Sequence, residues 1–199
     1  MLEVVLGRLL FPVAKYDNWQ IMPFILGDAN TGKSSILDIV ERWFSPMVVG
    51  TMDSSKCEKF GLENLHDKLV VFFRDLEQGF KRILPQAVWQ SMITGEDINI
   101  NVKFKTPLIK KWQIPMIGCG NVLFDYQDTS GSASRRLAVF RFLKLVENRD
   151  TQLVQKIISS ELVTIMLRCM VKYRNLADEY KGQDFWKEIA PAELSETKN

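Results

Sequence analysis

One segment of this sequence constrains the fold more than any other. Residues 27–34 read Gly-Asp-Ala-Asn-Thr-Gly-Lys-Ser and fit the pattern G-x-x-x-x-G-K-[ST] in full. Two glycines let such a loop curl until successive backbone N–H groups point inward at an anion. The loop follows the short apolar run 21–26, which is typical of a buried strand, and it opens an amphipathic helical pattern at Lys33. Strand, loop and helix in this order predict a phosphate-binding loop, called the phosphate loop below.

The chemistry expected of the phosphate loop is that of a nucleoside triphosphate site. Lys33 would neutralise the β and γ phosphates of ATP, and the Ser34 hydroxyl would bind Mg²⁺. The helix that follows adds the positive end of its dipole. The residues expected to bind the nucleotide are Gly27, Asp28, Ala29, Asn30, Thr31, Gly32, Lys33, Ser34 and Ser35. ATP and Mg²⁺ are therefore the expected cofactors.

Two acids follow the apolar run 68–73, the clearest buried strand in the sequence. Asp75 and Glu77 stand where a phosphate-bound Mg²⁺ needs a carboxylate. We expect Asp75 to join Ser34 as a magnesium ligand and Glu77 to orient the attacking water. The reverse assignment stays open because the strand register is not fixed by the sequence. The alternative is a pair of solvated acids that open a helix.

Asn121 ends a further apolar strand candidate, 115–119. Its amide is placed to contact both the γ-phosphate and the attacking water, although Asn after Gly is by itself usually a turn residue. The position downstream of the acidic pair favours a sensor of the nucleotide.

The most basic patch of the chain lies between these strands. The alternating run 98–102 predicts a half-exposed strand that turns back at Lys103-Phe104-Lys105, with Lys110 and Lys111 on the return. Such a tip suits single-stranded DNA, since lysines hold phosphates and the ring stacks on bases. A hairpin kept soluble by lysine is the alternative. Because the net charge is only +2, any nucleic-acid contact has to come from a local cluster of this kind.

Arg135 and Arg136 precede a strand candidate, 137–142. An arginine supplied by a neighbouring subunit can stabilise charge in phosphoryl transfer, and Arg136 is the expected residue, with Arg135 next in line. This interpretation requires an oligomer. An Arg pair on a solvated surface is the alternative.

The remaining pattern predicts an α/β fold with a mostly parallel sheet flanked by helices and an inserted β-hairpin. A helix is expected over 80–93, with Pro85 in its early turns, a short strand over 47–49, and one or two helices over 151–180. We expect one domain over 1–190, with a leading helix and linker over 1–20 and C-terminal helices over 150–190, then a polar tail over 191–199.

Composition excludes several other classes. The three cysteines are far apart, no CxxC pair exists and His66 is the sole histidine, which argues against a zinc site or a disulfide framework and favours reduced thiols in an intracellular protein. The sequence has no run of 18 apolar residues and no signal-peptide layout, so no membrane partner is expected.

Taken in order, these motifs resemble the superfamily 3 helicases of DNA viruses over roughly residues 6–142. The phosphate loop looks like that of papillomavirus and polyomavirus helicases, and the hairpin and sensor segments are similar to theirs in spacing and order. Residues 6–12 and residues 73–77 look more like the corresponding segments of the poxvirus-type primase-helicases of large nucleocytoplasmic DNA viruses. The acids separated by Leu76 depart from the adjacent pair of the papillomavirus group.

The resemblance implies a modified AAA+ type of P-loop NTPase, a hexameric ring and 3′-to-5′ travel on single-stranded DNA. It also implies a fused primase region, viral DNA replication and a location in the host cytoplasm. By motif, Lys33 and Ser34 match the phosphate-loop roles, and Asn121 matches the first sensor. Lys103 and Lys105 match the DNA-gripping tip, Arg136 matches the arginine finger, and Asp75 with Glu77 match the Walker B acids.

Two other functions remain open at this stage. A nucleoside or nucleotide kinase has a similar size and the same loop, but the lysine hairpin has no role in it. A non-catalytic assembly module that binds ATP to stabilise an oligomer is consistent with the separated acids.

Overall fold

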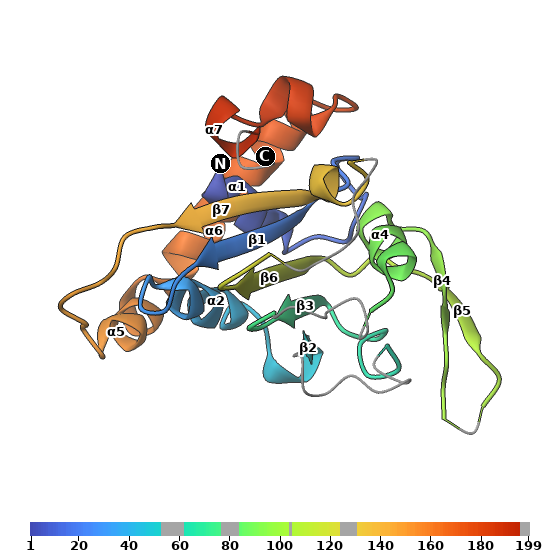
Figure 1. Cartoon of the computed structure of the whole chain (residues 1–199), viewed down its shortest axis with the longest axis horizontal. Helices are drawn as coiled ribbons and strands as arrows, with labels where there is room; N and C mark the ends of the chain where they lie inside the picture. The colour runs from blue at the N-terminus through green and yellow to red at the C-terminus, as the bar shows by residue number, and fades with distance from the viewer. Residues whose placement is uncertain (53–61, 77–83, 104, 124–130, 196–199) are drawn as a thin grey trace.

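Every strand pair of the central sheet in the described part of the computed structural model is parallel, which confirms the mostly parallel sheet that the sequence predicted. The structure describes residues 1–52, 62–76, 84–103, 105–123 and 131–195. Within them the sheet has the strand order β2-β3-β6-β1-β7 (Figure 1). Its strands are β1 (Met22–Gly27), β2 (Val49–Met52), β3 (Val70–Phe73), β6 (Met116–Gly120) and β7 (Leu137–Phe142). Strand β6 therefore lies between the strand that enters the phosphate loop and the strand that precedes Asp75.

Both faces of the sheet are covered, which explains why its strands read as unbroken apolar runs. Neighbouring residues of β1 point to opposite sides. Phe24 packs in the core cluster that contains Trp89 of α4 (Gln86–Thr94), whereas Ile25 packs with Leu37 of α2 (Lys33–Glu41). Two further helices, α1 (Leu2–Arg8) and α6 (Leu162–Glu179), complete the α2 side.

Helix α1 lies very close to α6. A Cβ atom built on Gly7 would meet the backbone oxygen of Cys169 at 2.0 Å, so only glycine permits this approach. One residue later Arg8 is buried and donates from Nε and Nη2 to the carboxylate of Asp17, at 2.8 and 3.0 Å. The Tyr173 hydroxyl of α6 donates to the same carboxylate. This cluster ties the first helix and its linker to the C-terminal helix.

The inserted hairpin is a separate two-stranded sheet. Strands β4 (Asp97–Ile100) and β5 (Leu108–Lys111) pair antiparallel and project from the body beside α4 (Figure 1). Ile98 and Ile100 are buried while the alternate residues of β4 are exposed, which confirms the predicted half-exposed strand. The hairpin leads directly into β6, so it leaves the sheet at the edge where the strands begin.

Some boundaries differ from the sequence expectations. Residues 46–48 form a 3-10 turn, and the strand begins only at Val49. Pro85 is the N-cap of α4 and precedes its first turn, while residues 80–83 of the helix expected over 80–93 lie outside the described residues. The expected tail includes a short helix, α7 (Ala192–Ser195), because Leu194 is buried against a C-terminal apolar cluster. The C-terminal region contains α5 (Leu153–Ser160) before α6, in agreement with the expectation of one or two helices.

Among the helices that the structure describes, none combines the length and the hydropathy needed to cross a bilayer.

Candidate active site

The phosphate loop leaves the sheet at the end of β1, and its two glycines are needed for different reasons. A Cβ on Gly27 would lie 2.3 Å from the backbone oxygen of Phe142 at the end of β7, so this glycine allows close packing of two strand ends. Gly32 has φ +91° and is the N-cap of α2, with open space where its Cβ would be. Asn30 has φ 62°, a left-handed conformation that Asn tolerates better than most residues. No side chain caps the first turn of α2, so its N–H groups face the loop.

The Lys33 ammonium is buried and is bound by the backbone of the phosphate loop itself. Lys33 is 6% exposed, and its Nζ donates to the backbone oxygen of Asp28 at 2.6 Å. The Thr31 hydroxyl donates to the same oxygen at 2.8 Å. Ser34, in the first turn of α2, is exposed. The N–H of Val146 donates to the Asn30 oxygen at 2.9 Å, so the chain after β7 runs past the outside of the loop.

The ends of three neighbouring strands bring the other predicted polar residues to the same edge. Asn121 directly follows β6 and Asp75 lies two residues after β3, and both are exposed. The N–H of Leu76 donates to the Cys119 oxygen at 3.0 Å, which fixes the acidic segment beside β6. Asp75 itself has φ 49°, a left-handed conformation that is uncommon outside glycine and tends to occur at functional sites.

Cys119, at the end of β6, is buried next to the segment that carries Asp75. Burial raises its pKa, the Asp75 N–H bonds to it, and Asp75, Arg74 and Lys33 all act on it electrostatically. The segment that carries Asp75 therefore lies directly beside the end of β6. Glu77, the other predicted acid, lies outside the described residues.

These residues fit a nucleotide-bound Mg²⁺. The ion usually takes one or two protein ligands and completes its octahedron with phosphate oxygens and water. The exposed Ser34 hydroxyl and Asp75 carboxylate supply such a set, although no cluster of three or more metal-ligating side chains occurs in the described part of the chain. Both would hold the ion against the phosphates.

Sequence reasoning missed Arg74. Its Nη1 donates to Asp38 at 2.9 Å and its Nη2 donates to Glu41, both on α2. The arginine thus fixes the segment carrying Asp75 against the helix that carries Lys33. Its partners lie 36 and 33 residues away, so no local pattern indicates the pairing.

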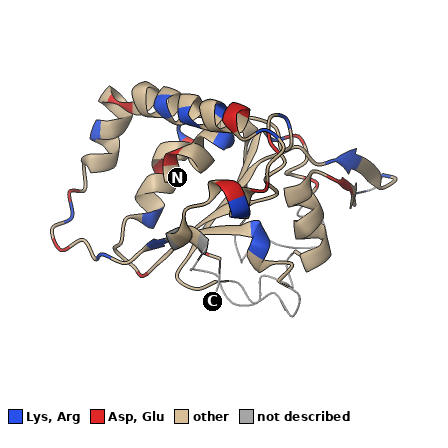
Figure 2. Cartoon of the chain, turned by 90° about the horizontal axis from the view of Figure 1, so that it is seen from above, with Lys and Arg blue, Asp and Glu red and all other residues tan. Residues whose placement is uncertain are grey.

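The lysine hairpin lies far from this edge. Lys103 and Lys105 are exposed at the tip, while Phe104 lies outside the described residues. The N–H of Lys103 is 3.3 Å from the carboxylate oxygens of Glu63, and Lys110 donates to the His66 oxygen. Elsewhere basic and acidic residues are interspersed (Figure 2), in keeping with the small net charge.

The two arginines lie at the sheet edge opposite to the phosphate loop. They end the 3-10 turn η2 (Ser134–Arg136), directly before β7, whose register pairs Leu137 with Met22 and Phe142 with Gly27. Five residue steps of about 3.3 Å put roughly 16 Å of strand between them and the loop. Arg135 is exposed, whereas Arg136 is 9% exposed and donates from Nη1 to the Ser132 oxygen at 2.7 Å.

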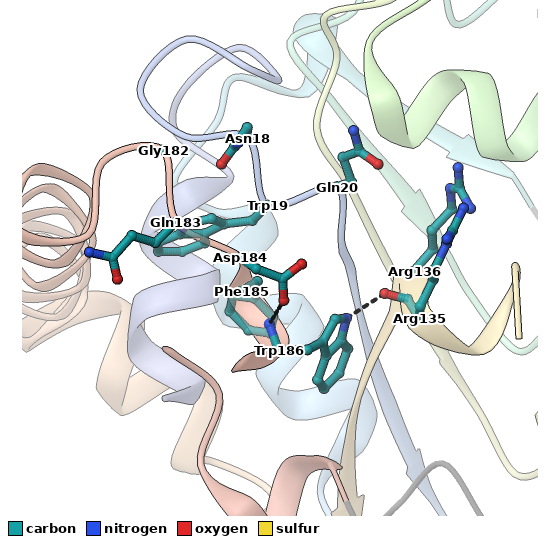
Figure 3. A pocket seen from close by; sticks show the side chains of 10 residues that line it. All are labelled: Asn18, Trp19, Gln20, Arg135, Arg136, Gly182, Gln183, Asp184, Phe185 and Trp186. Carbon is teal, nitrogen blue, oxygen red and sulfur yellow. Dashed lines mark hydrogen bonds between the residues drawn. The ribbon is translucent and has the colours of Figure 1, made fainter. Parts of the chain in front are cut away.

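A cavity of about 320 Å³ opens beside the arginine pair (Figure 3). The indole N–H of Trp186 donates to the Arg135 oxygen, and the Asp184 carboxylate accepts from the Trp186 N–H at 2.9 Å. Its lining residues are Asn18, Trp19, Gln20, Arg135, Arg136, Gly182, Gln183, Asp184, Phe185 and Trp186. No sequence pattern indicated this cavity, because its three segments are far apart in the chain.

The fold and this site define a P-loop α/β protein with a hairpin inserted before its central strand. Residues 25–136, more than half of the chain, match the Family of unknown function (DUF5906), and the chain belongs to that family. No curated protein matches the sequence at a significant level.

Solved structures share the fold. The C-terminal region of NrS-1 in its apo form has a TM-score of 0.59 and 17% identity, over 91% of this chain and 47% of the solved chain. The JCV helicase has a TM-score of 0.53 and 12% identity, over 100% of this chain and 59% of the other. The chain thus spans less than two thirds of either protein, and the likeness at these identities is one of fold.

Proposed function

We propose that this chain is the ATP-hydrolysing motor of a DNA helicase. In this proposal ATP hydrolysis at subunit interfaces drives translocation on single-stranded DNA and unwinding of duplex. One observation carries it: the phosphate loop and the arginine pair occupy opposite edges of one parallel sheet, and the lysine hairpin leaves from the arginine edge. A nucleotide on one subunit can then act on a neighbour's arginine and DNA contacts.

At the phosphate-loop edge, the proposed roles follow from position. ATP–Mg²⁺ binds between the loop and the strand ends, with Lys33 on the β and γ phosphates and Ser34 and Asp75 on the metal. Asn121, after the intervening strand, contacts the γ-phosphate or the attacking water. Glu77 remains the proposed residue for orienting that water.

At the other edge, the arginines serve the nucleotide of a neighbouring subunit, because roughly 16 Å of strand separates them from their own loop. The exposure of Arg135 supports it as the residue that contacts the neighbour's phosphates, since Arg136 is bonded inside its own subunit. The assembly in this proposal is a hexameric ring. Lys103 to Lys105 line its channel and hold the DNA backbone.

The wider setting rests on the family resemblance and on the helicase named among the similar folds. It comprises AAA+ type mechanics, a fused primase region, 3′-to-5′ travel, and viral DNA replication in the host cytoplasm.

The decisive experiment measures ATP hydrolysis by the protein with and without single-stranded DNA. We expect DNA to stimulate turnover, Lys33→Ala to abolish it, and Lys103→Ala/Lys105→Ala to remove the stimulation and the unwinding. Lys156→Ala, an exposed lysine on α5, is the matched control and should behave as wild type. Binding of ATP without turnover would indicate an assembly module instead, and phosphate transfer to a nucleoside would indicate a kinase.

A further inference from the structure

Arg136 is bound inside its own subunit. Its guanidinium is buried, and its Nη1 donates to the backbone oxygen of Ser132 within the same turn. Arg135, its neighbour in sequence, is exposed. The two arginines therefore face different surroundings, one outside the subunit and one inside it.

The residue that holds Arg136 is itself held by α4. The Ser132 hydroxyl accepts hydrogen bonds from Nε2 of Gln90 at 3.1 Å and from Nε2 of Gln86 at 3.4 Å. These two glutamines are four residues apart, so they lie on one face of the helix, one turn from each other. Ser132 thus binds the arginine through its backbone oxygen and α4 through its side chain.

Helix α4 continues directly into the lysine hairpin. Its C-cap is Gly95, with φ 76°, and the carboxylate of the next residue, Glu96, accepts from the Ser91 hydroxyl at 2.7 Å. The backbone oxygen of Glu96 accepts from the N–H of Trp112 at 2.9 Å, where the hairpin returns. Hydrogen bonds from Ser91 and Thr94 lower the pKa of Glu96, and the charge of Arg136 adds to this effect. The bonds of Glu96 to Ser91 and Trp112 therefore fix the base of the hairpin to the end of α4.

We propose that the Ser132 hydroxyl and its hydrogen bonds with Gln86 and Gln90 couple the segment that carries Arg135 to the lysine hairpin, so that the two segments move together. We call this set of contacts the joint. Arg136 is then a positioning residue, and Arg135 alone contacts the neighbour's nucleotide. A displacement of Arg135 when that nucleotide changes state passes through Ser132 and α4 to the hairpin. This inference rests on the proposed function, which supplies the nucleotide at one end and the DNA at the other.

The test compares Ser132→Ala with wild type and with Ser132→Thr, which keeps a hydroxyl. Ser160→Ala, an exposed serine on α5, controls for loss of a hydroxyl elsewhere. Three quantities are measured: basal ATP hydrolysis, its stimulation by oligo-dT, and affinity for labelled oligo-dT. A structural defect would alter all three, whereas a broken joint alters only the stimulation.

We expect Ser132→Ala to keep basal turnover and DNA affinity within about twofold and to lose roughly tenfold in DNA stimulation and unwinding, a coupling of ordinary size. Ser132→Thr should restore most of it. Gln90→Met, which keeps helix propensity, should reproduce the defect and replaces the alanine variant if that variant is unstable. Full stimulation by DNA in both Ser132→Ala and Gln90→Met would overturn the proposed joint but leave the proposed function standing. Absence of stimulation in wild type overturns the proposed function as well.

Discussion

At Gly32 the backbone has a left-handed conformation that favours glycine, and the structure offers a matched comparison. Gly32 and Gly182 both have positive φ, +91° and +80°, and a Cβ on either would meet nothing within 4 Å. Only Gly32 belongs to the phosphate loop. The effect of strain and the effect on nucleotide binding can therefore be separated.

We predict that Gly32→Ala and Gly182→Ala each destabilise the fold by about 1–2 kcal/mol, the cost of a left-handed alanine. Only Gly32→Ala should weaken binding of ATP, because it strains the loop that presents the N–H groups. Urea unfolding and titration with a fluorescent ATP analogue measure the two effects. Equal ATP affinity in both variants would show that the loop does not bind the phosphates.

Some properties of individual residues could be predicted from the sequence, and others could not. The phosphate loop could be predicted from the local sequence alone, because its conformation depends on its glycines and on the adjacent strand and helix. The pairing of Arg74 could not, since Asp38 and Glu41 are brought to it only by the packing of α2 against β3. The exposure of Arg135 and the burial of Arg136 likewise could not be predicted, because two adjacent arginines before a strand carry no local pattern that distinguishes them.

Among the elements, the junction of α1 with α6 depends on a buried ion pair. Arg8 donates to both oxygens of Asp17 and also from Nη1 to the Ile21 oxygen at 3.2 Å, and the Trp19 N–H donates to Asp17 at 2.9 Å. Burial alone would raise the pKa of Asp17, but Arg8 and the hydrogen bonds from Arg8, Tyr173 and Trp19 lower it below its ordinary value. The pair is well satisfied, so removing one partner leaves a buried charge.

We predict that Asp17→Asn destabilises the protein by about 3–5 kcal/mol. Asp178→Asn, which removes an exposed partner of Arg174, should cost less than about 1 kcal/mol. Because the folded pKa of Asp17 is lowered, its contribution is present above the ordinary pKa of 3.8 and is lost as pH falls through the folded value. Wild type should thus lose stability more steeply below about pH 4 than Asp17→Asn does, as measured by chemical unfolding. Parallel curves for the two proteins would contradict this.

The elements themselves were mostly predictable. Apolar runs between turn residues indicated the strands β1, β3, β6 and β7, and alternation indicated β4, because burial on two faces or on one dictates these patterns. The failures have tertiary causes. The sequence Pro46-Met-Val48 is apolar but forms a 3-10 turn that Pro46 begins, with Met47 exposed, and pairing with β3 starts at Val49. The expected tail packs against the body of the protein because the Leu194 side chain is buried in the C-terminal apolar cluster.

For the whole molecule, the order of the strands is what the sequence did not provide. The strand with Asn121 lies between those that precede the phosphate loop and Asp75, and all three end at one edge. Strand β7 starts at the other edge, so its preceding arginines are turned away from their own loop. In the proposed function these motifs form two half-sites on opposite sides of one subunit, the geometry that a head-to-tail assembly requires.

That geometry predicts complementation between inactive variants. Lys33→Ala removes the loop half-site and Arg135→Ala removes the arginine half-site, so each alone should lose ATP turnover. In an equal random mixture, about a quarter of the interfaces join an intact loop to an intact arginine, and about that fraction of wild-type turnover should return. A mixture of Lys33→Ala with Asp75→Ala is the control. Both changes affect the same half-site, so no interface is restored and no turnover should return. Recovery in the control equal to that in the test mixture, or none in the test mixture, would mean that the arginine does not act across subunits.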